Sequence, residues 1–131
     1  MRTLVIDDNL EYAQMLQMAL AEYGKVDVAE NGTEGFKAFC NALKNDTGYH
    51  LICLDVNMPM RDGFETVQYI RMMEQKLFLD EDQLVKIVLV SGFADHANAR
   101  RALQAGAEAL MSKTDGINKL LARLQEMGVL P

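Results

Sequence analysis

Short, continuous apolar runs alternate along the chain with longer segments whose apolar residues recur at helical spacing. Few polar residues interrupt these runs, and such runs are typical of strands that are covered on both faces of a sheet. The expected strands cover residues 3–6, 26–29, 51–54, 85–90 and 107–111. The last of them rests mainly on its place in the series.

The segments between the runs have the i, i+3, i+4 spacing of amphipathic helices. Their apolar stripes cover residues 12–23, 36–43, 64–70, 99–103 and 117–127. Gly24 and Gly106 are the expected stops of two of these helices, and Asp115 is the expected N-cap of the last. Strict alternation of five strands and five helices predicts an α/β fold, with a doubly wound five-stranded parallel sheet and helices on both faces.

The chain has no repeat and no linker rich in proline, glycine or serine. We therefore expect residues 1–131 to form a single domain, with no output domain in this chain. The longest connection, residues 74–84, carries Asp80, Glu81 and Asp82. A helical turn or an acidic loop is expected there.

Composition indicates an ordinary globular protein and narrows the choice of partners. Half of the residues are hydrophobic, 24% are charged, and 19 acidic against 13 basic side chains give a net charge of −6. A surface that follows nucleic-acid phosphates needs a concentrated basic face, and the sequence has no basic cluster beyond Arg100–Arg101. Direct nucleic-acid binding is therefore not expected.

The sequence also predicts a compartment. Cys40 and Cys53 make neither a disulfide framework nor a metal-binding spacing. The N-terminus reaches Asp7 too early for a signal peptide, and the apolar run 84–90 is too short to span a bilayer. We expect a cytoplasmic protein without membrane insertion.

Chemically distinctive side chains follow four of the five expected strands. Asp7 and Asp8 come after the first strand, Asp55 after the third, Ser91 after the fourth and Lys113 after the fifth. In open α/β sheets, the ligand site lies outside the carboxyl ends of the strands. We therefore expect three carboxylates, a hydroxyl and an ammonium group to meet at one edge of the sheet.

This set of groups suits phosphoryl transfer assisted by a metal ion. Clustered carboxylates repel one another unless a cation neutralises them, and Mg²⁺ accepts carboxylates, waters and phosphate oxygens as ligands. Phosphoryl transfer depends mainly on positioning and charge neutralisation, which an amine and a hydroxyl also provide. A carboxylate such as Asp55 can serve as the nucleophile.

The sequence resembles the receiver domain of response regulators over nearly the whole chain. The matching segments are VIDD at 5–8, LDVNMPMRDG at 54–63, VSG at 90–92 and AGA at 105–107, followed by Lys113. The D-x-x-M-P-x-x-D-G string within the second segment is highly specific. The resemblance implies a flavodoxin-like fold with strand order 2-1-3-4-5.

The resemblance also implies roles for the residues at the site. Asp55 would be the phosphoacceptor and a ligand of Mg²⁺, Asp8 would bind the ion directly, and Asp7 would act mainly through water. The backbone carbonyl of Asn57 would be a further ligand. Lys113 would pair with the phosphoryl group, and the Ser91 hydroxyl would turn inward to bind it.

Partners follow from the same resemblance. The donor would be a sensor histidine kinase or a histidine phosphotransfer protein. A downstream effector or a second copy would bind the face formed by the fourth helix, fifth strand and fifth helix. The chain would phosphorylate and dephosphorylate itself but would not turn over an external substrate. Met58–Pro59 and Asp62–Gly63 would shape the loop after the third strand, with Gly63 supplying a positive φ.

Four positions decide how far the family pattern applies. Leu110 stands where receiver domains often carry a switching tyrosine or phenylalanine, and Thr114 stands where a cis proline commonly follows the lysine. A cis bond before threonine would cost about 3 kcal/mol, so we expect Lys113–Thr114 to be trans. Asn57 and Phe93 occupy positions that tune hydrolysis, and we expect Phe93 to shield the acyl phosphate.

Other readings stay open from sequence alone. Asp7 and Asp8 could cap the first helix. An aspartyl phosphohydrolase would need an acid two residues after the nucleophile, where this chain has Asn57. A flavodoxin-like cofactor binder would need a phosphate loop after the first strand, where Asp7-Asp8-Asn9 would repel phosphate. A phosphorylation-independent interaction domain is the remaining alternative.

Overall fold

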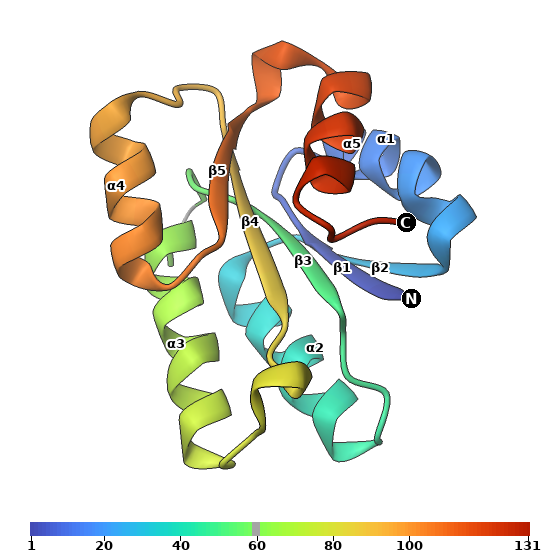
Figure 1. The fold of residues 1–131 in the computed structure, drawn as a ribbon, viewed down its shortest axis with the longest axis vertical. Helices are drawn as coiled ribbons and strands as arrows, with labels where there is room; N and C mark the ends of the chain where they lie inside the picture. Colours follow the sequence, from blue (N-terminus) through green and yellow to red (C-terminus); the bar gives the residue numbers. More distant parts are fainter. Residues whose placement is uncertain (59–60) are drawn as a thin grey trace.

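The computed structural model describes residues 1–58 and 61–131, which contain a five-stranded parallel sheet in the order β2-β1-β3-β4-β5 (Figure 1). The strands are β1 (Arg2–Ile6), β2 (Lys25–Ala29), β3 (Leu51–Asp55), β4 (Lys86–Ser91) and β5 (Ala109–Ser112). The predicted sheet and strand order are confirmed. Strand β5 begins two residues later than predicted, because the Ala107 amide bonds to the Ala102 carbonyl at the end of the preceding helix.

Helices cover both faces of the sheet, as predicted (Figure 1). They are α1 (Leu10–Leu20), α2 (Gly32–Lys44), α3 (Gly63–Lys76), α4 (His96–Ala105) and α5 (Ile117–Glu126), with 3₁₀ turns η1 (Ala21–Tyr23), η2 (Glu81–Gln83) and η3 (Lys113–Asp115). Turn η2 confirms the helical turn expected in the acidic connection. None of the helices in the described residues combines the length and apolarity needed to cross a membrane.

Two hydrophobic clusters hold the layers together. Leu4 and Ile6 of β1 belong to the cluster that also contains buried residues of α2, α3 and α4. Val5, between them, belongs to the cluster that contains buried residues of α1 and α5. Since successive strand residues point to opposite faces, a strand buried on both sides must be apolar throughout. This burial explains the continuous runs in the sequence.

The sequence suggested capping residues for two helices, and in both the structure has another residue at the N-cap. Asn9, rather than Asp7 or Asp8, caps α1 by accepting a hydrogen bond from the Tyr12 amide. The expectation that Asp115 caps α5 is wrong: the N-cap is Gly116, because Asp115 ends the 3₁₀ turn η3. The side chains of Asp7 and Asp8 are therefore not used to cap helix α1.

Gly63 lets helix α3 approach the end of β3. A Cβ atom on Gly63 would lie 2.5 Å from the Asp55 carbonyl oxygen and 2.9 Å from the Val56 Cα. Gly63 is not among the residues with positive φ, so the expectation that it supplies one is wrong. Its role is close packing behind Asp55, while Asp62 caps α3 by accepting from the Glu65 amide. The expected contribution of Pro59 to this loop lies outside the described residues.

Candidate functional site

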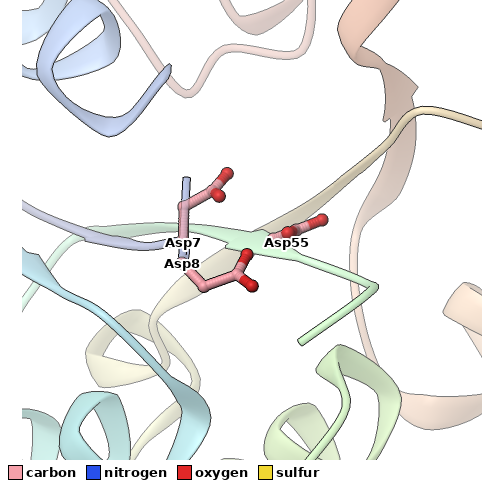
Figure 2. Close-up of side chains that lie close together, drawn as sticks. All are labelled: Asp7, Asp8 and Asp55. Atoms are coloured by element: carbon pink, nitrogen blue, oxygen red, sulfur yellow. The ribbon is translucent and has the colours of Figure 1, made fainter. Parts of the chain in front are cut away.

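Three carboxylates meet at the carboxyl ends of β1 and β3. One oxygen from each of Asp7, Asp8 and Asp55 lies within 4.8 Å of the other two (Figure 2). Asp7 and Asp55 are buried, with 2% and 4% of their surface exposed, whereas Asp8 is exposed. The predicted convergence of these side chains is present in the structure.

Lys113 reaches into this cluster from the start of η3, directly after β5. Its Nζ lies 2.9 Å from Asp7 Oδ2 and 3.5 Å from Asp55 Oδ2. It also lies 4.6 Å from the centroid of the Tyr12 ring. The ammonium group therefore partly neutralises two buried carboxylates and packs on an aromatic face.

The cluster makes ionisation of Asp55 unfavourable. Burial, followed by the negative charge of Asp7, raises the pKa of Asp55 from 3.8 to about 6. Lys113 and a hydrogen bond from the Asn57 amide to Asp55 Oδ1, at 3.2 Å, act in the opposite direction, and Asp8 raises the pKa further. One ammonium group thus leaves the excess negative charge of the cluster incompletely balanced.

The oxygens of the cluster fit a hard divalent cation. Asp7 Oδ1 accepts a hydrogen bond of 2.8 Å from the Asn9 amide, but the buried Oδ2 accepts none from the described residues, although Lys113 lies beside it. The Lys113 ammonium group, 2.9 Å from this oxygen, compensates part of its charge, but three carboxylates still surround one ammonium group. Three carboxylates within reach of one another are ligands that Mg²⁺ accepts. The role expected for the Asn57 carbonyl stays a prediction.

Ser91 lies at the same edge of the sheet but is engaged in its own loop. It ends β4, is buried, and pairs in register with Ser112 of β5. Its Oγ accepts from the Phe93 amide at 3.0 Å and donates to the Phe93 carbonyl at 3.1 Å. The Asn98 side-chain amide donates to the same carbonyl at 3.1 Å. An inward turn of Ser91 toward a phosphoryl group would have to break this closed pair of hydrogen bonds.

Thr114 and Leu110 mark the departures from the family pattern. The described residues contain no cis peptide bond, so the predicted trans bond between Lys113 and Thr114 is confirmed. The Thr114 hydroxyl instead lies 2.7 Å from the Ser112 hydroxyl, and the Thr114 amide donates to Ser112 Oγ. Leu110 is half-buried and packs against the cluster beneath α4.

Tyr12 is the site residue that the sequence reasoning missed, because its spacing placed it in the apolar stripe of the first helix. Its half-buried ring does pack against the core, yet it also faces Lys113. Burial, with smaller contributions from Cys53, Asp7 and Asp55, raises the pKa of Tyr12 to about 12, so the phenol is neutral near neutral pH. The usable signal was its place in the first helical turn after the two aspartates.

Comparison with known proteins decides the family. Residues 3–125 match the model of the response regulator receiver domain. The chain belongs to this family. The transcriptional regulatory protein TctD of Salmonella typhimurium is 31% identical over 128 residues, which are 97% of this chain and 51% of TctD. This receiver domain therefore spans about half the length of that relative.

Other relatives resemble the receiver domain over most of their length. A probable chemotaxis protein CheY of Rhizobium etli is 25% identical over 126 residues, 95% of this chain and 89% of that protein. The structure of Vibrio cholerae CheY4 has a TM-score of 0.78 and 26% identity, and the match covers 95% of this chain and 96% of that one. The receiver domain of the histidine kinase CKI1 from Arabidopsis thaliana, complexed with Mg²⁺ and BeF₃⁻, has a TM-score of 0.79 and 25% identity, covering 97% and 89%.

Proposed function

We propose that this receiver domain accepts a phosphoryl group on Asp55 from a sensor histidine kinase or a histidine phosphotransfer protein. The observation that carries the proposal is the buried carboxylate of Asp55 at the end of β3, with Asp7, Asp8 and Lys113 around it. Family membership supports the same assignment. The chain would then signal through a change in partner binding.

In the proposed reaction an Asp55 oxygen attacks the phosphorus atom of the donor. The new O–P bond forms as the N–P bond of the donor phosphohistidine breaks, and the electron pair of that bond returns to the imidazole. Lys113, now 3.5 Å from Asp55 Oδ2, would move onto an oxygen of the transferred group and offset its charge. The Asn57 amide holds the other oxygen of Asp55 in place.

Asp7, Asp8 and Asp55 are the residues that would hold Mg²⁺, with the Asn57 carbonyl as a further ligand. When bound, the ion supplies positive charge that offsets the carboxylates and the phosphoryl oxygens. The excess of three clustered carboxylates over the one ammonium group of Lys113 supports a cation at this place. Asp7 remains anchored through its other oxygen, which accepts from the Asn9 amide.

The proposed output runs from Ser91 to the face formed by α4, β5 and α5. Phosphorylation would favour release of the Ser91 hydroxyl from the Phe93 backbone, which would free the loop before α4 to change conformation. This face contains a cavity of about 330 Å³ lined by residues that include Ala94, Leu110 and Arg123. We propose this face as the binding site for an effector or a second copy, with Leu110 giving a smaller switch than an aromatic residue would.

Turnover of an external substrate is not part of the proposal. Asn57 stands where an aspartyl phosphohydrolase needs its acid, and an amide cannot exchange a proton in that role. We also propose a cytoplasmic location. The free thiols of Cys40 and Cys53 are consistent with a reducing compartment.

Intact-mass measurement after incubation with a small acyl phosphate and Mg²⁺ tests the proposal. The wild type should gain one phosphoryl group, Asp55→Asn should gain none, and a chelator should abolish the gain. Asp46→Asn is a matched control, because Asp46 is exposed and its φ of 62° suits asparagine. If neither the wild type nor Asp46→Asn gains mass, the proposal is contradicted, and a phosphorylation-independent interaction domain becomes the favoured alternative.

A further inference from the structure

The Tyr12 ring contributes a third contact to the amine that serves Asp55. Lys113 Nζ lies 4.6 Å from the ring centroid, within the distance of about 6 Å over which an aromatic face attracts an ammonium group. Its other two contacts are Asp7 Oδ2 and Asp55 Oδ2. The amine is therefore held from three elements: the end of β1, the end of β3 and the first turn of α1.

Local structure fixes the ring in this position. The side chain of Asn9 caps α1 by accepting from the Tyr12 amide at 3.1 Å, and the Asn9 carbonyl accepts from the Ala13 amide. Tyr12 is half-buried and packs against the cluster between the sheet and helices α1 and α5. The same turn that follows the metal-binding aspartates thus aims the ring at Lys113.

Lys113 needs the contact with Tyr12 because its own stem is flexible and the carboxylates beside its amine are also proposed to bind a cation. Lysine has a flexible four-carbon stem, and the trans Lys113–Thr114 bond begins a short 3₁₀ turn. The two carboxylates beside it are also the proposed ligands of a divalent cation. An aromatic face attracts the ammonium group without adding negative charge or occupying a ligand oxygen.

We propose that Tyr12 is a positioning residue, whose ring keeps the Lys113 ammonium group beside Asp55 when a cation occupies the carboxylates. This inference rests on the proposed function, because phosphoryl transfer is one of its readouts. The aromatic ring makes the contact with Lys113, so Tyr12→Phe should preserve the positioning of Lys113, whereas an aliphatic substitution should not. Loss of the ring should slow phosphorylation of Asp55 roughly threefold to tenfold.

Nuclear magnetic resonance of the metal-free, unphosphorylated protein tests the contact directly. Aromatic ring currents displace the signals of protons above the ring face, so the ε-CH₂ protons of Lys113 should show a displaced shift in the wild type and in Tyr12→Phe. Tyr12→Leu should return them to the ordinary lysine position. An unchanged Lys113 signal in Tyr12→Leu would overturn the inference, whatever the reaction rate.

The rate of phosphorylation by a small acyl phosphate tests the function of the contact. Tyr12→Leu should be slowed, Tyr12→Phe should recover the wild-type rate to within about twofold, and Tyr69→Leu should match the wild type. Tyr69 is the matched control, because its ring, on helix α3, lies 4.2 Å from the guanidinium carbon of Arg61, which precedes that helix, in a second cation–π pair. Tyr12→Met, which fills a similar space with a flexible side chain, takes the place of Tyr12→Leu if the latter does not fold.

The outcomes separate this inference from the function on which it rests. A wild type that takes up no phosphoryl group overturns the proposed function and, with it, any role of Tyr12 in transfer. A phosphorylated wild type with Tyr12→Leu reacting equally fast overturns the inference alone. Tyr12→Phe as slow as Tyr12→Leu would assign the effect to the hydroxyl group and also overturn it.

Discussion

Asp55 combines the position of a nucleophile with an environment that opposes its ionisation. It is buried beside Asp7, and its pKa is raised to about 6 although Lys113 lies 3.5 Å away. A carboxylate in this setting is ionised near neutral pH, yet its charge costs stability until a cation or a phosphoryl group alters the balance. A cation bound at the proposed site would therefore raise the folding stability.

Replacing Asp55 by asparagine should stabilise the metal-free protein above about pH 6. The folded pKa near 6 exceeds the ordinary value of 3.8, so ionisation of Asp55 lowers stability as pH rises between these values. The difference corresponds to as much as about 3 kcal/mol at neutral pH and disappears below about pH 4. Urea unfolding of the wild type and Asp55→Asn across this pH range, in chelator, measures it.

Asp46→Asn provides the control, since an exposed carboxylate should change the free energy of unfolding little at any of these pH values. Mg²⁺ should stabilise the wild type more than Asp55→Asn, because the site proposed for the ion exists only in the folded protein and includes Asp55. Equal stability of the wild type and Asp55→Asn near neutral pH in chelator would contradict the strained carboxylate cluster.

Phe93 is the residue that we expect to shield the acyl phosphate from water. Its backbone holds the Ser91 hydroxyl, and its side chain is 68% exposed in the loop after β4. Phe93→Ala should shorten the lifetime of the phosphorylated protein severalfold, measured as loss of the added mass after removal of the donor. The lifetime of phosphorylated Phe93→Leu, which keeps an apolar side chain, should fall between those of the wild type and Phe93→Ala. A Phe93→Ala lifetime equal to that of the wild type would refute shielding.

At the residue scale the sequence predicted which side chains gather but not how each is oriented. Asp7, Asp8, Asp55 and Lys113 could be placed because each follows a strand, and the ends of parallel strands share one edge. The hydrogen bonds of Ser91 within its own loop depend on a rotamer and a loop conformation that spacing does not determine. The contact between Tyr12 and Lys113 was not predicted, because the spacing of Tyr12 indicated only a core position and its ring also packs there.

At the element scale, an ion-pair network ties α3 to the amino ends of β4 and β5, and periodicity gave no sign of it. Arg71 Nη1 lies 2.6 Å from Glu74 Oε1, and Arg71 Nη2 lies 3.0 Å from Glu108 Oε1. Glu74 is 2% exposed, and its other oxygen accepts from the Val85 amide at 2.8 Å. The network therefore joins these elements at the edge of the sheet opposite the carboxylate cluster.

Glu74→Ala should lower the free energy of unfolding by about 3 kcal/mol, because it leaves the Val85 amide and Arg71 without their buried partner. Urea unfolding measures the loss. Glu74→Gln should lose less, since its amide oxygen can still accept from Val85. Glu81→Ala, at an exposed position of η2, is the control and should change stability by no more than about 0.5 kcal/mol. A loss below about 1 kcal/mol in Glu74→Ala would show that the network adds little.

The type and order of the elements were predictable, but several of their ends were not. Burial on both sheet faces leaves a clear apolar signature, which placed all five predicted strands within two residues of those observed. Helix starts depend on local backbone geometry that spacing does not determine: Asn9 caps α1, where Asp7 and Asp8 were alternatives, and Gly116, which offers no side-chain cap, holds the N-cap position expected of Asp115. Gly63 is likewise required by the close approach of α3 to the end of β3, which depends on the assembled fold.

At the scale of the whole molecule, the receiver fold brings together groups that are distant in the chain. The order β2-β1-β3-β4-β5 sets β1 beside β3, so Asp7 and Asp55 meet, and Lys113 enters from beyond β5 (Figure 1). Two core clusters hold the sheet between its helices, which keeps these groups in register. The face of α4, β5 and α5 is the one that we propose for partner binding, and a change at the site would reach it through the loop between β4 and α4.

Mapping of the acyl phosphate tests the central claim most directly. After incubation with a small acyl phosphate and Mg²⁺, borohydride reduces a phosphorylated aspartate to homoserine, and peptide mass spectrometry locates that residue. We predict homoserine at position 55 in the wild type and in Asp46→Asn, and at no position in Asp55→Asn. Homoserine at position 7 or 8, or in Asp55→Asn, would contradict the account.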